Sequence, residues 1–310
     1  MPFYTMPDCE QLFVREYGQG QPVLVLSGLG MLSWQWTPFL YPLGQNFRFI
    51  IPEWRGFGAS KHCKIPQLDA ISSHWQDINC LIEQLKLNDL IVIAYSMGAT
   101  TTMHGLKYGN FAASIRAYLH IDQTPKISVD NDWAYGLFGS QHTDFIAILE
   151  QISVLLENQK HQQTLQQMDK QARQQLAQLW LQFIQLQNNN PKHIKMFGWL
   201  LQQPKLSSFL FPSQDIQYMK WYIDNYLHHK EDYRAAITQL TCPVTFFTGT
   251  QSKLYAAAGQ TQIAQSIPHS KQVLFHKSGH TPLINEPIKF AKEIRQFLNE
   301  QSSRAIQQSA

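Results

Sequence analysis

Short apolar runs bounded by turn residues dominate the first third of the chain. They lie at residues 23–26, 47–51, 90–93 and 117–121. Runs of this length that are apolar at successive positions are typical of strands buried on both faces of a parallel sheet. Between them, residues 74–85 carry apolar side chains at three- and four-residue spacing, which predicts a helix. Alternating strands and helices predict an α/β fold with a mostly parallel central sheet and helices on both faces.

The pattern changes after about Pro125, where apolar residues recur at helical spacing. Helical patterns lie at residues 145–156, within the glutamine-rich stretch 151–187, and at 191–201 and 215–228. We therefore predict an all-helical insertion over residues 131–232. Such an insertion would form a lid over the carboxyl ends of the strands, where open α/β sheets place their sites.

Strand-like runs return at residues 244–247 and 273–275, and a helical pattern follows at 287–298. Residues 1–130 and 233–298 are therefore expected to form one core that the insertion interrupts. The tail, residues 299–310, is polar and is predicted to fray.

The chain of 310 residues has a net charge of only +3 and no run of basic residues. A nucleic-acid partner is therefore disfavoured, and a small, largely uncharged substrate is favoured. No segment approaches the unbroken stretch of about 20 apolar residues that a membrane span requires. The amino-terminal sequence lacks a basic segment followed by an apolar one, so no secretory signal is predicted. Four widely spaced cysteines fit a reducing compartment, so we expect a cytoplasmic protein without membrane association.

Residues 94–98, Ala-Tyr-Ser-Met-Gly, carry the strongest chemical signal. They follow a strand-like run, precede a helical pattern and match the G-x-S-x-G elbow, with alanine in place of the first glycine. A strand-to-helix bend of this kind projects the Ser96 hydroxyl at a helix N-terminus, which stabilises developing negative charge. Ser96 is thus the candidate nucleophile; the alternative is a helix N-cap serine.

Three further motifs, taken with this elbow, resemble the α/β-hydrolase superfamily. Residues 26–30, Leu-Ser-Gly-Leu-Gly, look like its oxyanion loop, with Ser27 in place of the usual histidine. Residues 53–60 resemble its Asp-x-Arg-Gly-x-Gly-x-Ser turn, and residues 278–282 match the loop that bears the catalytic histidine. The resemblance covers nearly the whole chain and implies the α/β-hydrolase fold.

The resemblance also implies roles for single residues. His280 would be the base that takes the proton of Ser96, and the backbone N–H groups of Leu29 and Met97 would form the oxyanion hole. His276 competes with His280, but it lies within an apolar run and lacks the Gly-His-x-Pro context. No metal and no organic cofactor are expected.

The third member of the triad departs from the family pattern. The family's acid normally stands at the fourth position of a Gly-x-x-Asp turn, and here that position, in residues 249–252, is Ser252. Without an acid, the tautomer of the imidazole would be unfixed. Asp122, at the end of the preceding strand, is the best replacement, because some members of the superfamily place their acid there. The alternative is that Asp122 caps a turn before Pro125.

A substrate pocket is expected beside these residues. Trp34 and Trp36 follow the oxyanion loop and are expected to face the acyl group of the substrate. For other aromatic residues, core packing is the stronger alternative. The predicted pocket consists of Gly28, Trp34, Trp36, Tyr95 and Trp133.

Three functions stay open. The first is a serine hydrolase that cleaves a carboxylic ester or lactone through an acyl-enzyme, and within that class the chain resembles quorum-quenching hydrolases of N-acyl homoserine lactones. The second is a cofactor-free dioxygenase of the same superfamily, in which His280 and Asp122 deprotonate a hydroxyquinolone-type substrate. The third is a receptor that has lost turnover, which Ser252 suggests. The expected partner is a small amphiphilic acyl ester or lactone. The sequence leaves open whether the protein forms a homo-oligomer.

Overall fold

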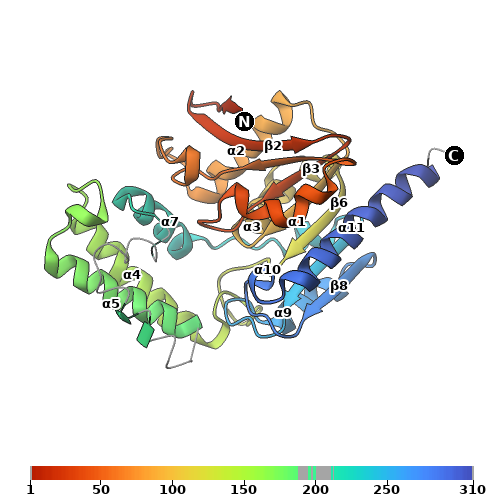
Figure 1. Ribbon diagram of the computed structural model, residues 1–310. Coiled ribbons are helices and arrows are strands. Elements are labelled where there is room, and N and C mark those ends of the chain that lie inside the picture. The colour runs from red at the N-terminus through yellow and green to blue at the C-terminus, as the bar shows by residue number, and fades with distance from the viewer. Residues whose placement is uncertain (1, 188–194, 197, 200–210, 212, 309–310) are drawn as a thin grey trace.

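The computed structural model describes the chain except residues 1, 188–194, 197, 200–210, 212 and 309–310 (Figure 1). In the described part, eight strands form one sheet in the order β1-β2-β4-β3-β5-β6-β7-β8. The two amino-terminal strands pair antiparallel, and the pairs from β4 to β8 are parallel. The strands are β1 (Phe3–Thr5), β2 (Gln11–Gly18), β3 (Gln21–Leu26), β4 (Phe47–Pro52), β5 (Leu90–Tyr95), β6 (Ile115–Ile121), β7 (Val244–Gly249) and β8 (Ser270–Phe275).

The mostly parallel sheet predicted from the sequence is confirmed, and all six predicted strands belong to it. The pattern of apolar runs did not predict β1 and β2, which form one edge of the sheet. The burial of β2 changes along its length from buried Leu12 to exposed Gly18, so this strand has neither a continuous apolar run nor a clean alternation.

Both faces of the sheet are buried, because successive side chains of a strand point to opposite faces. On β3, Leu24 and Leu26 join one apolar cluster, whereas Val23 and Val25 join a second cluster on the other face. The first cluster includes side chains of α2 (Ala70–Gln84), α3 (Met97–Tyr108), α8 (Arg234–Thr238) and α9 (Ala257–Gln265). The second includes side chains of α1 (Thr37–Leu40), α10 (Pro282–Asn285) and α11 (Pro287–Gln308).

The helix α11 differs from its prediction at the carboxyl end. It continues through Gln308, although the polar tail beyond residue 298 was expected to fray. Glu300 forms an ion pair with Lys271 of β8, with 2.9 Å between the charged atoms, and Gln301 is buried. The helix therefore remains attached to the core as far as Gln301.

A third apolar cluster lies outside the sheet. It is built around α4 (His142–Asn158), α5 (Lys170–Gln187) and α7 (Ile216–His228), which gather to one side of the core in Figure 1. No strand occurs among the described residues of the range 131–232. The helix predicted at residues 191–201 falls largely outside the described residues.

The two connections between this helical unit and the core lie side by side. Lys126 and Asp232 form an antiparallel bridge, and the amide of Tyr233 donates to the carbonyl of Pro125 at 2.9 Å. The unit is also attached through α7, because the Tyr222 hydroxyl donates to the carbonyl of Arg55 at 2.7 Å. Within the described residues, no helix combines the length and apolar character that a membrane crossing needs.

The register of the parallel strands determines where a site can form. Ala94 of β5 pairs with Leu26 of β3, and Tyr95 pairs with Ile121 of β6. Ile121 in turn pairs with Phe247 of β7. The loops that follow these four strands therefore leave the sheet at the same edge.

Candidate active site

Ser96 lies in the bend between β5 and α3. Its backbone angles are φ 52° and ψ −119°, a left-handed conformation that is strained for a residue with a side chain. The bend brings α3 against β3 so closely that a Cβ atom at Gly98 would lie 2.2 Å from the carbonyl oxygen of Leu26. A glycine is therefore required at residue 98, as the elbow motif predicts.

His280 joins Ser96 to Asp122. Its Nε2 lies 3.0 Å from Ser96 Oγ, and its Nδ1 lies 2.6 Å from Asp122 Oδ2. An ionised carboxylate only accepts hydrogen bonds, so Nδ1 carries the proton and Nε2 is left to accept from the serine hydroxyl. The three side chains thus form a continuous hydrogen-bonded chain.

Two tyrosines hold the imidazole of His280 in place. The ring of Tyr95 stacks on it with 5.1 Å between centroids, and the Tyr95 hydroxyl donates to the His280 carbonyl at 3.0 Å. Tyr255 meets the imidazole edge-on at 5.3 Å. Burial raises the pKa of both phenols, so both stay neutral at physiological pH.

Asp122 follows β6 and is fully buried. Its backbone φ is 40°, and its amide donates to the carbonyl of Phe247 on β7 at 2.9 Å. The sequence left open whether Asp122 caps a turn before Pro125. Instead, Gln123 Oε1 accepts from the amide of Thr124 at 2.7 Å, and the carboxylate of Asp122 turns toward β7 and His280.

Four hydrogen bonds divide evenly between the oxygens of Asp122. Oδ1 accepts from the amide of Gly249 at 3.1 Å and from Gln260 Nε2 at 2.9 Å. Oδ2 accepts from Ser252 Oγ at 2.9 Å and from His280. Ser252, at the position where the family pattern expects the acid, is therefore a donor to the acid supplied by the neighbouring strand.

The two residues predicted for an oxyanion hole lie on segments next to Ser96. A Cβ atom at Gly28 would lie 2.9 Å from the Tyr95 ring and 3.4 Å from Ser96 Cβ, so the loop that carries Leu29 passes against the serine. Met97 is the first residue of α3, and its N–H consequently has no acceptor within the helix.

The structure does not place Trp34 and Trp36 together in a pocket. Both belong to a 3₁₀ helix (Ser33–Trp36), in which residues two apart point in different directions. Trp34 is 55% exposed and lines a surface cavity of about 430 Å³ whose other lining residues all come from residues 37–42. Trp36 is fully buried, where its Nε1 donates to Ser27 Oγ at 3.0 Å. The structure therefore gives no support to the prediction that the two rings face an acyl group.

Trp133 is likewise a packing residue. It is buried, its Nε1 donates to Thr124 Oγ1 at 3.1 Å, and the guanidinium of Arg234 lies 5.3 Å from its ring. These contacts occupy the indole nitrogen and one ring face. Of the five predicted pocket residues, only Gly28 and Tyr95 adjoin Ser96 and His280 in the contacts described above.

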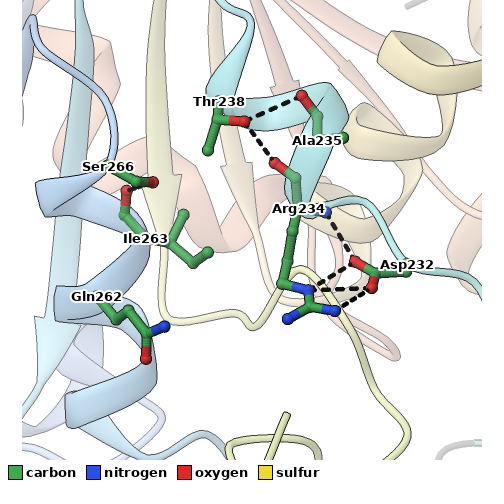
Figure 2. Close-up of a pocket in the computed structure, with 7 residues that line it drawn as sticks. All are labelled: Asp232, Arg234, Ala235, Thr238, Gln262, Ile263 and Ser266. Atoms are coloured by element: carbon green, nitrogen blue, oxygen red, sulfur yellow. Dashed lines mark hydrogen bonds and ion pairs between the residues drawn. The ribbon is translucent and has the colours of Figure 1, made fainter. Parts of the chain in front are cut away.

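A separate cavity of about 560 Å³ lies between α8 and α9 (Figure 2). Arg234 lies on its wall, held by Asp232 through contacts of 2.6 to 3.0 Å. None of the predicted site residues lines this cavity, so it is distinct from the Ser96 site. Its lining residues are Asp232, Arg234, Ala235, Thr238, Gln262, Ile263 and Ser266.

Comparison with known families identifies the fold. A family model for the α/β hydrolase fold matches residues 21–287, which is most of the chain. The chain belongs to the α/β-hydrolase fold family. This membership confirms the fold predicted from the elbow, the oxyanion loop and the histidine loop.

This α/β hydrolase is similar to a curated pimeloyl-[acyl-carrier protein] methyl ester esterase from Vibrio vulnificus, with 22% identity over 282 residues, 90% of this chain and 95% of the relative. Among solved structures, it resembles an esterase from Exiguobacterium antarcticum, with a TM-score of 0.68, 19% identity and coverage of 96% and 99%. It also resembles Est816, an N-acyl homoserine lactone degrading enzyme, with a TM-score of 0.62, 15% identity and coverage of 96% and 100%. At these identities, the structural likenesses show the fold.

Two further neighbours of Asp122 and His280 lie outside the family motifs, although Tyr255 is among the aromatic residues for which the sequence leaves a choice between pocket and core. Gln260 lies within α9 and Tyr255 just before it, and neither belongs to a motif of the α/β hydrolases quoted above. Only the folded chain brings them to Asp122 and His280.

Proposed function

We propose that this α/β hydrolase cleaves carboxylic esters through an acyl-enzyme formed on Ser96. The observation that carries the proposal is the chain of two hydrogen bonds, 3.0 Å and 2.6 Å, that links Ser96 through His280 to Asp122. A nucleophile, a base and a group that orients the base are the three parts that acyl transfer to serine requires.

In the first half of the reaction, Ser96 Oγ forms a bond to the ester carbonyl carbon while His280 Nε2 takes the hydroxyl proton. The negative charge that develops on the carbonyl oxygen is stabilised by the N–H groups of Leu29 and Met97. The carboxylate of Asp122 stabilises the imidazolium formed on His280.

The carbon–oxygen bond to the leaving alcohol then breaks, and His280 returns the proton to that oxygen. A water molecule attacks the acyl-enzyme in the second half, again with His280 as base. The carboxylic acid leaves and Ser96 regains its proton, so the cycle consumes one ester and one water molecule.

We further propose that the helical unit, residues 131–232, acts as a lid. Tyr255 supports this role, because its ring contacts His280 and also belongs to the apolar cluster of α4, α5 and α7. An apolar interior that reaches the catalytic histidine suits the hydrocarbon part of an acyl ester.

The proposed substrate is an amphiphilic acyl ester, and an N-acyl homoserine lactone is one candidate. The likeness to Est816 supports a lactone. The likeness to a pimeloyl-[acyl-carrier protein] methyl ester esterase supports an open methyl ester. Hydrolysis of acyl methyl esters and homoserine lactones with matched acyl chains distinguishes the two by the ratio of their kcat/KM values.

The proposed chemistry is tested with p-nitrophenyl esters and a fluorophosphonate label. We expect wild type to hydrolyse the esters and to be labelled, and Ser96→Ala to lose both properties. His280→Gln should lose hydrolysis, whereas His276→Gln, which changes an exposed histidine four residues away, should keep it. Hydrolysis that persists in Ser96→Ala contradicts the proposal.

The same variants test the alternative functions. A dioxygenase that uses the His280–Asp122 pair as its base has no need of the Ser96 hydroxyl. Oxygen uptake with a hydroxyquinolone that survives Ser96→Ala therefore supports a dioxygenase, and binding without turnover in wild type supports a receptor.

A further inference from the structure

Gln260 makes a side-chain contact to Asp122 that the proposed chemistry leaves without a role. It lies on the buried face of α9 with 1% of its surface exposed. Its Nε2 donates to Asp122 Oδ1 at 2.9 Å and to the carbonyl of Tyr255 at 3.1 Å. Both amide hydrogens are thus used, one of them on the carboxylate.

The other end of the same amide is unsatisfied. Gln260 Oε1 is buried and has no hydrogen-bond partner among the described atoms. A buried acceptor without a partner destabilises a fold, and a methionine of similar volume would fill the space without that cost. Packing therefore does not explain why residue 260 carries an amide. The hydrogen bond that this amide donates to the charged carboxylate of Asp122 does explain it.

The hydrogen bonds of Asp122 show what the amide does. Gly249 and Gln260 hold Oδ1, while Oδ2 faces His280. We propose that Gln260 is a positioning residue, which fixes the rotation of the Asp122 carboxylate so that Oδ2 points at His280 Nδ1. This inference rests on the proposed function of the triad.

The amide also affects the charge that His280 experiences. A hydrogen-bond donor on Oδ1 draws negative charge toward itself and away from Oδ2. Without the donor, more of the negative charge stays on Oδ2, beside the imidazole. The groups that face His280 from the neighbouring elements are Ser96, Asp122, Tyr95 and Tyr255, and burial keeps the two phenols neutral.

Gln260→Met, assayed in the full chain with p-nitrophenyl esters, tests the inference. We expect kcat to fall about ten- to one-hundredfold with little change in KM, as for loss of one hydrogen bond to a charged group. The acidic limb of the pH profile of kcat/KM should move to higher pH. Unchanged kcat and an unmoved acidic limb would overturn the inference.

Gln262→Met is the matched control. Gln262 lies on the same helix. It is two residues after Gln260, so its side chain points about 200° away around the helix axis. It is exposed and lines the cavity of Figure 2. The same substitution there should leave kcat and the pH profile unchanged, so an equal loss in both variants would indicate damage to α9 rather than a positioning role.

Gln260→Glu keeps the shape of the side chain in case Gln260→Met fails to fold. Its carboxyl group donates to Asp122 only while it carries a proton, and ionisation puts two negative charges together. We expect its activity relative to wild type to fall as pH rises. A constant ratio across pH would count against the proposed contact.

Proton NMR tests the contact without relying on turnover. The short bond from His280 Nδ1 to Asp122 should give a downfield proton signal that is absent in Asp122→Asn. We expect this signal to shift in Gln260→Met and to stay in place in Gln262→Met. If wild type shows the signal but no Ser96-dependent hydrolysis, the proposed function fails while the positioning contact stands. A signal that does not shift in Gln260→Met overturns the inference alone.

Discussion

Ser252 Oγ donates a hydrogen bond of 2.9 Å to Asp122 Oδ2. The residue that stands where the superfamily pattern expects an acid thus supports an acid that comes from the adjacent strand. The register explains this arrangement, because Ile121 of β6 pairs with Phe247 of β7 and the two following loops meet at one edge. Under the proposed chemistry, the acid follows β6 instead of β7, and it still lies beside His280.

The Asp122 carboxylate should be essential for turnover. Asp122→Asn keeps the size of the side chain but removes the charge and the acceptor that fix the tautomer of His280. We expect kcat to fall about 10⁴-fold, with KM little changed. Steady-state kinetics on p-nitrophenyl esters measure the loss, and circular dichroism checks that the fold is intact. Ser252→Ala removes only one hydrogen-bond donor to Asp122, so we expect a smaller loss of kcat than in Asp122→Asn. An equal loss in the two variants would contradict this expectation.

An acid at residue 252 should partly replace Asp122. Ser252 Oγ lies 2.9 Å from the carboxylate oxygen that contacts His280, and an aspartate side chain reaches further than a serine. We expect the double variant Asp122→Asn with Ser252→Asp to recover at least tenfold of the kcat lost in Asp122→Asn alone, roughly 1.4 kcal/mol of transition-state stabilisation. Ser252→Asp by itself places two carboxylates in contact and should reduce activity. No recovery in the double variant would show that residue 252 does not reach the imidazole.

The close approach of the oxyanion loop predicts a steric effect at Gly28. A Cβ atom there would lie 2.9 Å from the Tyr95 ring, which in turn stacks on His280. Gly28→Ala should therefore destabilise the fold by about 1–3 kcal/mol and lower kcat. Thermal unfolding and ester hydrolysis measure the two effects. Gly44→Ala is the control, because its new Cβ would meet no atom closer than 3.4 Å.

Acid should destabilise the protein through His74. Burial, and secondarily the charge of Arg55, lower the pKa of His74 from 6.5 to about 3. Between those values the unfolded chain binds a proton that the folded chain does not, so this contribution to stability is complete above pH 6.5 and is lost as the pH falls toward 3. The expected slope is about 1.4 kcal/mol per pH unit for one histidine.

His74→Phe isolates that contribution. It keeps a ring against Trp54, on which His74 stacks at 4.4 Å, and removes the titrating group. The variant also loses the hydrogen bond between His74 and Tyr222, which lowers its stability at every pH. The quantity to compare is therefore the slope of the unfolding free energy against pH. Denaturant unfolding between pH 4 and 7 should give a shallower slope than wild type. The same change at the exposed His62 should leave the slope as it is.

The sequence was sufficient where one pattern determines one local structure. The central strands are apolar on both faces, and the elbow requires Gly98 wherever α3 packs on β3, so both could be predicted. The roles of Trp34 and Trp36 depend on the rotation of a short 3₁₀ helix, which residue order alone does not determine. Gln260 acts through a contact across 138 positions of sequence, and no local pattern marks such a residue.

The site draws on both sides of the helical insertion, and this has a consequence for folding. Ser96 and Asp122 precede residues 131–232, whereas Gly249, Ser252 and His280 follow them. The two halves meet through the parallel pairing of β6 with β7. Contacts so distant in sequence close late and slowly during folding. Under the proposed chemistry, the return of ester hydrolysis after dilution from denaturant therefore times the moment when the second half of the chain docks onto the first.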